Sequence, residues 1–261
     1  MGSTGYWEIR TYECGGLGEK TKYWVPGEPP ARGRKLGRSS ERKQRQNEND
    51  ATRRLNREIH ANFSAGDLFL GLDYGPKKYS ELLRRAEARQ EADRAAGQEP
   101  GILEDYLRKE ANRELDNFIR RVKRRLPPGA ELKYIAVTSD MDGETGEAVR
   151  IHHHIIANRA AWQACVEAWP HGGAYAKALS AQKDYTPLAE YLLAQVRRLP
   201  DEKKYKPSRN LVRPQPKCRV VWSGAELRVP KGCELLYRTA YSGKRAGQYI
   251  RYALPFAPMR S

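Results

Sequence analysis

The stretch RIHHHIIAN, residues 150–158, gathers three of the five histidines of the chain inside an apolar segment. Side chains of a β-strand point alternately to its two faces, so a strand here places His152 and His154 side by side and turns His153 the other way. Two imidazoles on one face can hold one divalent metal ion. The alternative is that they only decorate a strand, because a bare His-x-His pair is a short motif that often occurs by chance.

The segments around this strand predict an antiparallel sheet with helices. The turn-forming stretch DMDGETG, residues 140–146, separates it from an apolar run at 132–138, which indicates a β-hairpin. Helical spacing of apolar residues over 102–126 precedes this hairpin. We also expect strands over 67–74 and 173–179, and helices over 51–62, 159–168 and 187–198. This order predicts an α+β fold, an antiparallel sheet with helices on one face, close to the ferredoxin-like plan.

Composition divides the chain into three parts. Residues 1–50 carry Gly-Gly, Pro-Pro and a basic polar run, which predicts a loosely structured N-terminal arm suited to phosphate contact. Residues 51–215 form the predicted core, with a highly charged helical insertion near 77–100. Residues 216–261 combine apolar residues with intervening glycines and predict a small β-rich C-terminal extension.

The charge of the chain indicates a polyanionic partner. Its 261 residues include 48 Lys and Arg against 32 Asp and Glu, a formal net charge of +16. This excess favours nucleic acid over an acidic membrane surface. No apolar run approaches the roughly 20 residues that cross a bilayer, so we expect a cytoplasmic protein without a membrane partner. The four cysteines are widely scattered and indicate neither a zinc knuckle nor a disulfide framework.

Four segments, taken in order, carry a resemblance to a known family. They are residues 62–74, 134–138, 152–156 and 185–211, and the last of them includes YLLAQ and SRNL. With these segments the chain resembles the replication-associated proteins related to the filamentous-phage gene II initiator, within the HUH endonucleases. The resemblance implies an endonuclease that nicks single-stranded DNA at a replication origin and so starts rolling-circle replication of a phage, plasmid or integrated element.

The resemblance also implies the parts of an active site. His152 and His154 would hold a divalent metal ion, Mn or Mg. Tyr191 would attack the phosphodiester, leaving a 5′-phosphotyrosine link and a free 3′-OH, and the same site would later rejoin strands. Spacing alone fits a buried helix position for Tyr191 equally well, and Tyr185 is the second candidate nucleophile. Where the family often has a lysine after the tyrosine, this chain has Gln195.

The third metal ligand is left open by the sequence. Relatives commonly place a glutamate at the end of the strand before the hairpin, where this chain reads VTSD, residues 137–140. Asp140 is the first candidate, and Glu144 or Glu147 in the turn are alternatives, although acidic residues in turns are usually solvated. An oxygen ligand beside two imidazoles suits Mn or Mg better than a sulfur-rich zinc site does.

We expect DNA contact from the basic residues that follow the proposed nucleophile, which are Arg197, Arg198, Lys203, Lys204, Lys206 and Arg209. The sequence contains no GxxxxGK[ST] phosphate loop, so a host helicase and polymerase would have to extend the nicked strand. Two other functions stay open. One is a non-enzymatic nucleic-acid-binding protein on the same fold, and the other is a metal-dependent hydrolase that uses activated water.

Overall fold

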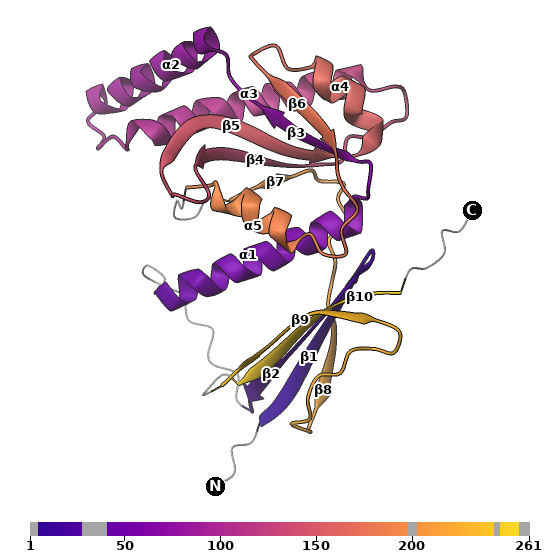
Figure 1. Cartoon of the computed structure of the whole chain (residues 1–261). Coiled ribbons are helices and arrows are strands. Elements are labelled where there is room, and N and C mark those ends of the chain that lie inside the picture. The colour runs from indigo at the N-terminus through magenta and orange to yellow at the C-terminus, as the bar shows by residue number, and fades with distance from the viewer. Residues whose placement is uncertain (1–4, 28–40, 198–202, 243–245, 256–261) are drawn as a thin grey trace. The chain divides into compact units, whose positions relative to one another are not determined.

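The computed structural model describes residues 5–27, 41–197, 203–242 and 246–255. They belong to two compact units, and each unit has a five-stranded sheet (Figure 1). The histidine unit consists of residues 63–181 and 188–211 and contains the histidine strand. The terminal unit consists of the remaining residues, which come from both ends of the chain and from the short segment 182–187.

The sheet of the histidine unit has the strand order β6-β3-β5-β4-β7, and its neighbouring strands are antiparallel. The predicted hairpin is confirmed, because β4 and β5 pair with His154 opposite Val137. On the other side of β5, Gly71 of β3 lies opposite His154. The histidine strand is therefore the central strand of this sheet. The bounds of the strands are β3 Leu68–Leu72, β4 Tyr134–Met141, β5 Ala148–Ala157, β6 Ala174–Ala178 and β7 Lys206–Pro207.

The core of this unit lies between one face of the sheet and three helices, α2 (Pro76–Ala95), α3 (Leu103–Arg125) and α4 (Trp162–Glu167). A short 3₁₀ helix, η1 (Arg159–Ala161), leads into α4. The α3 helix buries an apolar stripe at helical spacing, as its sequence predicts. Alternate residues of the strands pack against these helices, including Leu70, Ile151 and Ile155. The unit is thus an α+β fold with an antiparallel sheet, as predicted.

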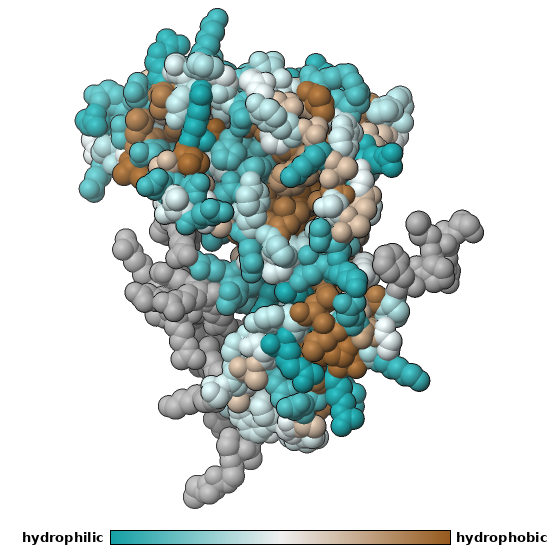
Figure 2. Space-filling view, in the orientation of Figure 1, coloured by the Kyte–Doolittle hydropathy of each residue, from teal (hydrophilic) through white to brown (hydrophobic). Residues whose placement is uncertain are grey.

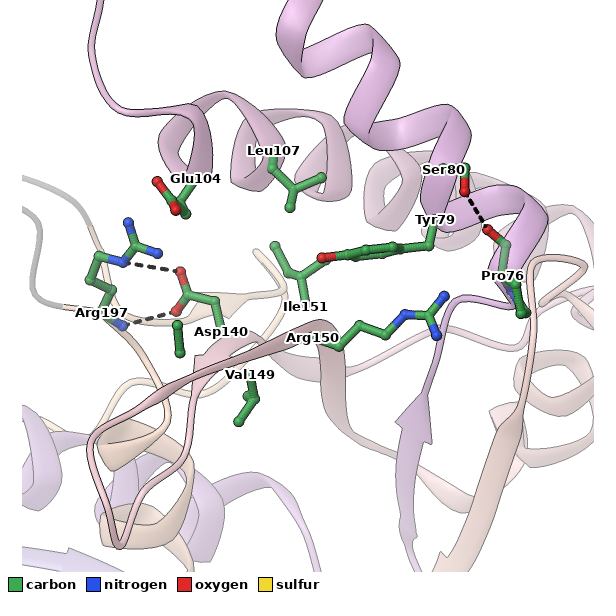
Figure 3. Close-up of a pocket in the computed structure, with 11 residues that line it drawn as sticks. Pro76, Tyr79, Ser80, Glu104, Leu107, Asp140, Val149, Arg150, Ile151 and Arg197 are labelled. Carbon is green, nitrogen blue, oxygen red and sulfur yellow. Dashed lines mark hydrogen bonds and ion pairs between the residues drawn. The ribbon is translucent and has the colours of Figure 1, made fainter.

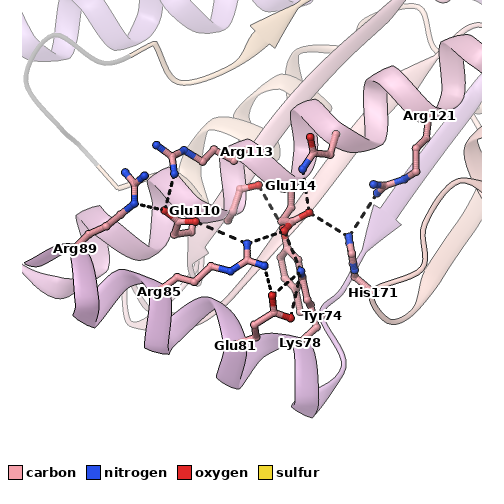
Figure 4. Close-up of polar contacts among 12 residues, drawn as sticks. Tyr74, Lys78, Glu81, Arg85, Arg89, Glu110, Arg113, Glu114, Arg121 and His171 are labelled. Carbon is pink, nitrogen blue, oxygen red and sulfur yellow. Dashed lines mark hydrogen bonds and ion pairs between the residues drawn. The ribbon is translucent and has the colours of Figure 1, made fainter.

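Ion pairs join α2 to α3, as Figure 4 shows. Two glutamates of α3, Glu110 and Glu114, are buried. Their partners are Lys78, Arg85, Arg89, Arg113 and His171. The charged segment near 77–100 is therefore largely helical, as predicted, but part of its charge binds the neighbouring helix instead of facing only solvent.

The prediction of a loosely structured arm over residues 1–50 is wrong for 5–26 and 41–50, which form strands and a helix, while 1–4 and 28–40 lie outside the described residues. Residues 5–26 form a hairpin in which Cys14 pairs with Leu17 across Gly15 and Gly16, and Gly15 has the positive φ of 57° that such two-residue turns require. The β-rich C-terminal extension is confirmed as strands, but these strands pair with the hairpin in one sheet, β8-β1-β2-β10-β9. Their bounds are β1 Gly5–Cys14, β2 Leu17–Pro26, β8 Lys217–Val221, β9 Glu234–Tyr241 and β10 Gly247–Ala253.

One helix packs against this second sheet. The α1 helix spans Glu41–Asn62, so it contains the predicted helix over 51–62 and begins ten residues earlier. Leu55 and Ile59 are buried, as their spacing predicts. The guanidinium of Arg53 lies 3.9 Å from the ring centroid of Tyr249, and that of Arg57 lies 4.0 Å from the ring centroid of Tyr12. These cation–π contacts hold α1 on the sheet.

The surface is mainly polar in the view of Figure 2, where hydrophobic residues gather only in small separate areas. None of the helices in the described ranges combines the length and the apolar character needed to span a bilayer.

Candidate metal centre

The two histidines predicted to act together lie side by side on the sheet. The Nε2 atoms of His152 and His154 are 3.1 Å apart. Two nitrogens that each bind one ion at about 2.1 Å cannot be more than about 4.2 Å apart, so this separation fits a shared ion. His154 is 8% exposed and its ring stacks on Phe69 of β3, with 5.7 Å between the ring centroids.

The hydrogen bonds of the pair direct a lone pair of His152 toward His154. The Nδ1 atom of His152 lies 2.9 Å from the carbonyl oxygen of Arg150, which can only accept, so in the neutral ring Nδ1 carries the proton and Nε2 carries the lone pair. Burial, and secondly the nearby His152, lower the pKa of His154 to about 4, so this ring is neutral at pH 7. Its Nδ1 atom is buried without a hydrogen-bond partner in the described part of the chain.

Gln195 supplies a third donor atom that the sequence analysis did not assign as a ligand. Its Oε1 atom lies 3.1 Å from Nε2 of His154. Its side-chain amide nitrogen donates to the carbonyl oxygen of Tyr191, which directs the amide oxygen toward the histidines. Nε2 of His152 and Oε1 of Gln195 are therefore two acceptors that both face Nε2 of His154, and a single proton on His154 cannot satisfy both. A bound cation would resolve this conflict.

The backbone around Gln195 explains why its side chain is held in place. It follows helix α5 (Thr186–Ala194), and its carbonyl oxygen accepts hydrogen bonds from the backbone amides of Asp140 and Met141 at 3.1 and 3.2 Å. A Cβ atom at Gly143 would lie 3.3 Å from Cβ of Ala194, so glycine permits the hairpin turn to pack closely on the end of α5. The hairpin and α5 thus fix Gln195 next to His154.

Tyr191, the first candidate nucleophile, lies beside the histidine pair. Its ring centroid is 5.5 Å from that of His154, in an edge-on arrangement. The side chain is 49% exposed, so it is not the buried core residue that its helical spacing also allowed. The structure therefore brings together His152, His154, Tyr191 and Gln195.

His153 lies on the opposite face of the sheet and has a structural role. It is fully buried, and burial lowers its pKa to about 3, so it is neutral at pH 7. Thr138 donates its hydroxyl proton to Asn112, so its oxygen accepts from Nδ1 of His153 at 3.0 Å. The Nε2 atom of His153 then accepts from the hydroxyl of Tyr74 at 2.7 Å. These bonds fix the central residue of the histidine strand.

Asp140, the predicted third metal ligand, is not brought to the histidine pair. Ser139 is the residue opposite His152 in the β4–β5 ladder, and alternation turns Asp140 to the other face. There its carboxylate pairs with Arg108 of α3 at 2.7 Å and with Arg197 at 3.6 Å. Glu144 and Glu147, the alternatives, are exposed in the hairpin turn.

Asp140 and Arg197 instead line a pocket of about 520 Å³ between β5 and the helices α2 and α3 (Figure 3). Arg150 lines it as well, and its guanidinium lies 4.3 Å from the ring centroid of Tyr79.

The remaining predicted residues are placed apart from this pair or outside the described residues. Tyr185, the second candidate nucleophile, belongs to the terminal unit, where it is buried and its ring lies 4.7 Å from that of His60. Among the predicted DNA contacts, Arg197 pairs with Asp140 and Lys206 with Asp116. Arg198 lies outside the described residues. Lys203 and Arg209 are exposed and Lys204 is partly buried.

The donor set fits a divalent metal ion, although the protein supplies only part of a coordination shell. No group of three or more His, Cys, Asp or Glu side chains is placed to hold a metal in the described ranges. Two imidazole nitrogens and one amide oxygen can bind a first-row divalent ion that completes its shell with water or phosphate oxygens.

In comparisons with protein-family models, curated proteins and solved structures, nothing matches this chain.

Proposed function

We propose that this protein is an HUH-type, metal-dependent endonuclease and strand transferase that nicks single-stranded DNA at a replication origin. The observation that carries the proposal is the convergence of His152 and His154 with Gln195, beside an exposed tyrosine, Tyr191, whose ring lies 5.5 Å from His154. A metal-binding pair next to an accessible nucleophile is the arrangement that phosphoryl transfer to a tyrosine needs.

The order of the elements supports the same proposal. Residues 68–178 run as strand, two helices, strand, strand, short helix, strand, and without the first of the two helices this order would match the ferredoxin-like split βαβ plan. In this reading β3, α3, β4, β5, α4 and β6 form the core, α2 is an insertion after the first strand, and α5 carries the tyrosine. The α5 end lies on the face of the histidine pair and the other three helices lie on the opposite face.

The proposed reaction is a transesterification at phosphorus. A divalent cation held by the two histidines and Gln195 would polarise a nonbridging phosphate oxygen and stabilise the departing oxygen. The phenolic oxygen of Tyr191 forms the new bond to phosphorus and the bond from phosphorus to O3′ breaks. Tyr191 loses its phenolic proton and the released O3′ gains a proton, so the exchange consumes and releases no net proton. Reversal of the same exchange, with another 3′-OH as nucleophile, rejoins strands.

The experiment that tests this function uses a randomised single-stranded DNA library labelled at its 3′ end, incubated with the full chain and Mn²⁺. The label should become covalently attached to the protein and should survive denaturing electrophoresis. Tyr191→Phe and the double variant His152→Ala/His154→Ala should lose the attachment. Tyr175→Phe is the matched control, because Tyr175 is 65% exposed and stands in β6 opposite Gly71.

Each other outcome assigns a different function. Binding without cleavage or attachment would favour the non-enzymatic nucleic-acid-binding protein. Metal-dependent cleavage without attachment would favour a hydrolase that uses activated water. Attachment that persists in Tyr191→Phe would overturn the role given to Tyr191. If the reaction proceeds as proposed, a polymerase added afterwards should extend the released 3′-OH.

A further inference from the structure

The positive charge of the chain is concentrated in the terminal unit. This unit contains 24 Lys and Arg against 11 Asp and Glu, whereas the histidine unit contains 24 against 21. The terminal unit therefore holds 13 of the 16 net positive charges. The candidate metal centre lies in the nearly balanced unit, and two of the cations predicted to bind DNA there are paired with carboxylates. Attraction of a polyanion must come mainly from the other unit.

The terminal unit also exposes aromatic and apolar side chains on one sheet face. Trp222 follows β8 directly and is 79% exposed, and Val220 is 51% exposed. Val220 pairs with Glu8 and Val221 with Trp7, so Trp222 continues the ladder on the face of Tyr6. The rings of Tyr6 and Trp222 touch edge-on with 6.3 Å between their centroids.

A cation borders these rings on the same face. The guanidinium of Arg10 lies 5.1 Å from the ring centroid of Tyr23, the residue opposite Glu8 in the β1–β2 ladder. Glu8 is the acidic residue next to these rings, and it is bound by both Arg10 and Tyr23. We define the aromatic patch as Tyr6, Arg10, Tyr23, Val220 and Trp222.

Folding alone does not account for this arrangement. A tryptophan that keeps four-fifths of its surface exposed contributes little by burial, and an indole beside a second ring offers a flat face to a ligand. Lys217 and Arg219 of the edge strand β8 are also exposed, but alternation turns them to the opposite face, so Arg10 is the β1 cation on the face of the rings. Stacking rings within a positively charged surface are the features with which proteins hold single-stranded nucleic acid.

We propose that the aromatic patch is a binding site for single-stranded nucleic acid, separate from the candidate metal centre. The bases stack on Trp222 and Tyr6, and the phosphates are attracted by the excess cations of this unit. The inference adds a second DNA site to the proposed function. If both hold, the terminal unit captures the strand that the histidine unit cuts.

The test measures binding of fluorescently labelled oligothymidylate to the full chain in EDTA, so that no cleavage can occur. Trp222→Ala should weaken binding about 5- to 150-fold, the range that loss of one stacking side chain produces. Trp222→Phe should restore most of the affinity, since a phenyl ring also stacks. Ile102→Ala is the control, because Ile102 is a 54% exposed apolar residue of the histidine unit. Because Trp222 is exposed, its replacement should leave the urea unfolding curve unchanged.

Three results would overturn this inference. The first is that Trp222→Ala and the unaltered chain bind the oligonucleotide with equal affinity. The second is that Ile102→Ala loses as much affinity as Trp222→Ala does. The third is that the unaltered chain binds duplex and single-stranded DNA of the same length with equal affinity. Oligouridylate in place of oligothymidylate separates RNA from DNA as the preferred strand. The proposed nuclease activity would be refuted, and the binding site kept, if the unaltered chain binds single-stranded DNA in EDTA but forms no covalent product with Mn²⁺.

Discussion

The Oε1 atom of Gln195 lies 3.1 Å from the Nε2 atom of His154. The contact links the end of α5 to the histidine strand, and it puts an amide oxygen where a carboxylate was expected. The carboxylate of Asp140, which the sequence suggested for this place, is instead held on the opposite face by Arg108.

Replacing Gln195 by alanine should weaken metal binding. Without the amide oxygen a bound ion has only two protein ligands, so we expect the affinity for Mn²⁺ to fall about tenfold or more. Isothermal titration calorimetry of the metal-free chain with Mn²⁺ measures this. Gln163→Ala is the matched control, because Gln163 is exposed on α4. An affinity unchanged in Gln195→Ala would show that this amide is not a ligand.

Tyr74→Phe should destabilise the histidine unit. The substitution removes the donor to Nε2 of His153 and leaves that buried acceptor without its 2.7 Å hydrogen bond. An unsatisfied buried acceptor costs about 1–3 kcal/mol of unfolding free energy. Urea unfolding followed by circular dichroism checks the value. Tyr175→Phe, at an exposed tyrosine, should change the unfolding free energy by less than about 0.5 kcal/mol.

Three buried histidines should make the protein less stable in acid. Burial lowers the pKa of His60 and that of His154 to about 4, and that of His153 to about 3, from an ordinary value of 6.5. The unfolded chain therefore binds more protons than the folded chain between pH 6.5 and pH 4, and stability is lost as the pH falls through this range. Each histidine contributes roughly 1.4 kcal/mol per pH unit. Equal unfolding free energies at pH 7 and pH 5 would contradict this.

Glu114→Gln should weaken the attachment of α2 to α3. Burial opposes ionisation of Glu114, but hydrogen bonds from Lys78 and Asn117 and the nearby charges hold its pKa at about 2. The carboxylate therefore stabilises the fold above about pH 4.5, and this contribution is lost as the pH falls toward 2.

At pH 7 we expect Glu114→Gln to cost about 1–3 kcal/mol in urea unfolding, because it leaves Lys78 and Arg85 without their shared carboxylate. Glu91→Gln removes the surface ion pair between Glu91 and Arg94 of α2, and it should change the free energy of unfolding by less than about 1 kcal/mol. A loss no larger in Glu114→Gln than in Glu91→Gln would mean that the buried network does not stabilise the helix pair.

Local pattern predicts much of the histidine unit, because its elements depend on short-range periodicity. The two-residue period of strands places His152 and His154 on one face, and the stripe of apolar residues identifies α3. The same alternation also accounts for Asp140, because it shares no face with Ser139, the residue opposite His152. Gln195 could not be assigned in this way, since its position depends on how α5 packs against the hairpin turn.

The terminal unit could not be predicted from local pattern for a related reason. The two strands over 5–26 find their other partners, β8 for β1 and β10 for β2, more than 200 residues later in the chain, so no local window contains the sheet. The available signal was the aromatic content of both hairpin strands around Gly15 and Gly16, which favours a tight hairpin over a loose arm. The basic, polar composition of the same region favours a loosely structured arm instead.

The most direct measurement is to map the amino acid that becomes attached to DNA. The full chain is incubated with single-stranded DNA and Mn²⁺, digested, and the nucleotide-bearing peptide is sequenced by mass spectrometry. We expect a 5′-phosphotyrosyl bond at Tyr191, formed only with metal and absent from His152→Ala/His154→Ala. Attachment at another tyrosine, or a metal-independent product, would contradict this expectation.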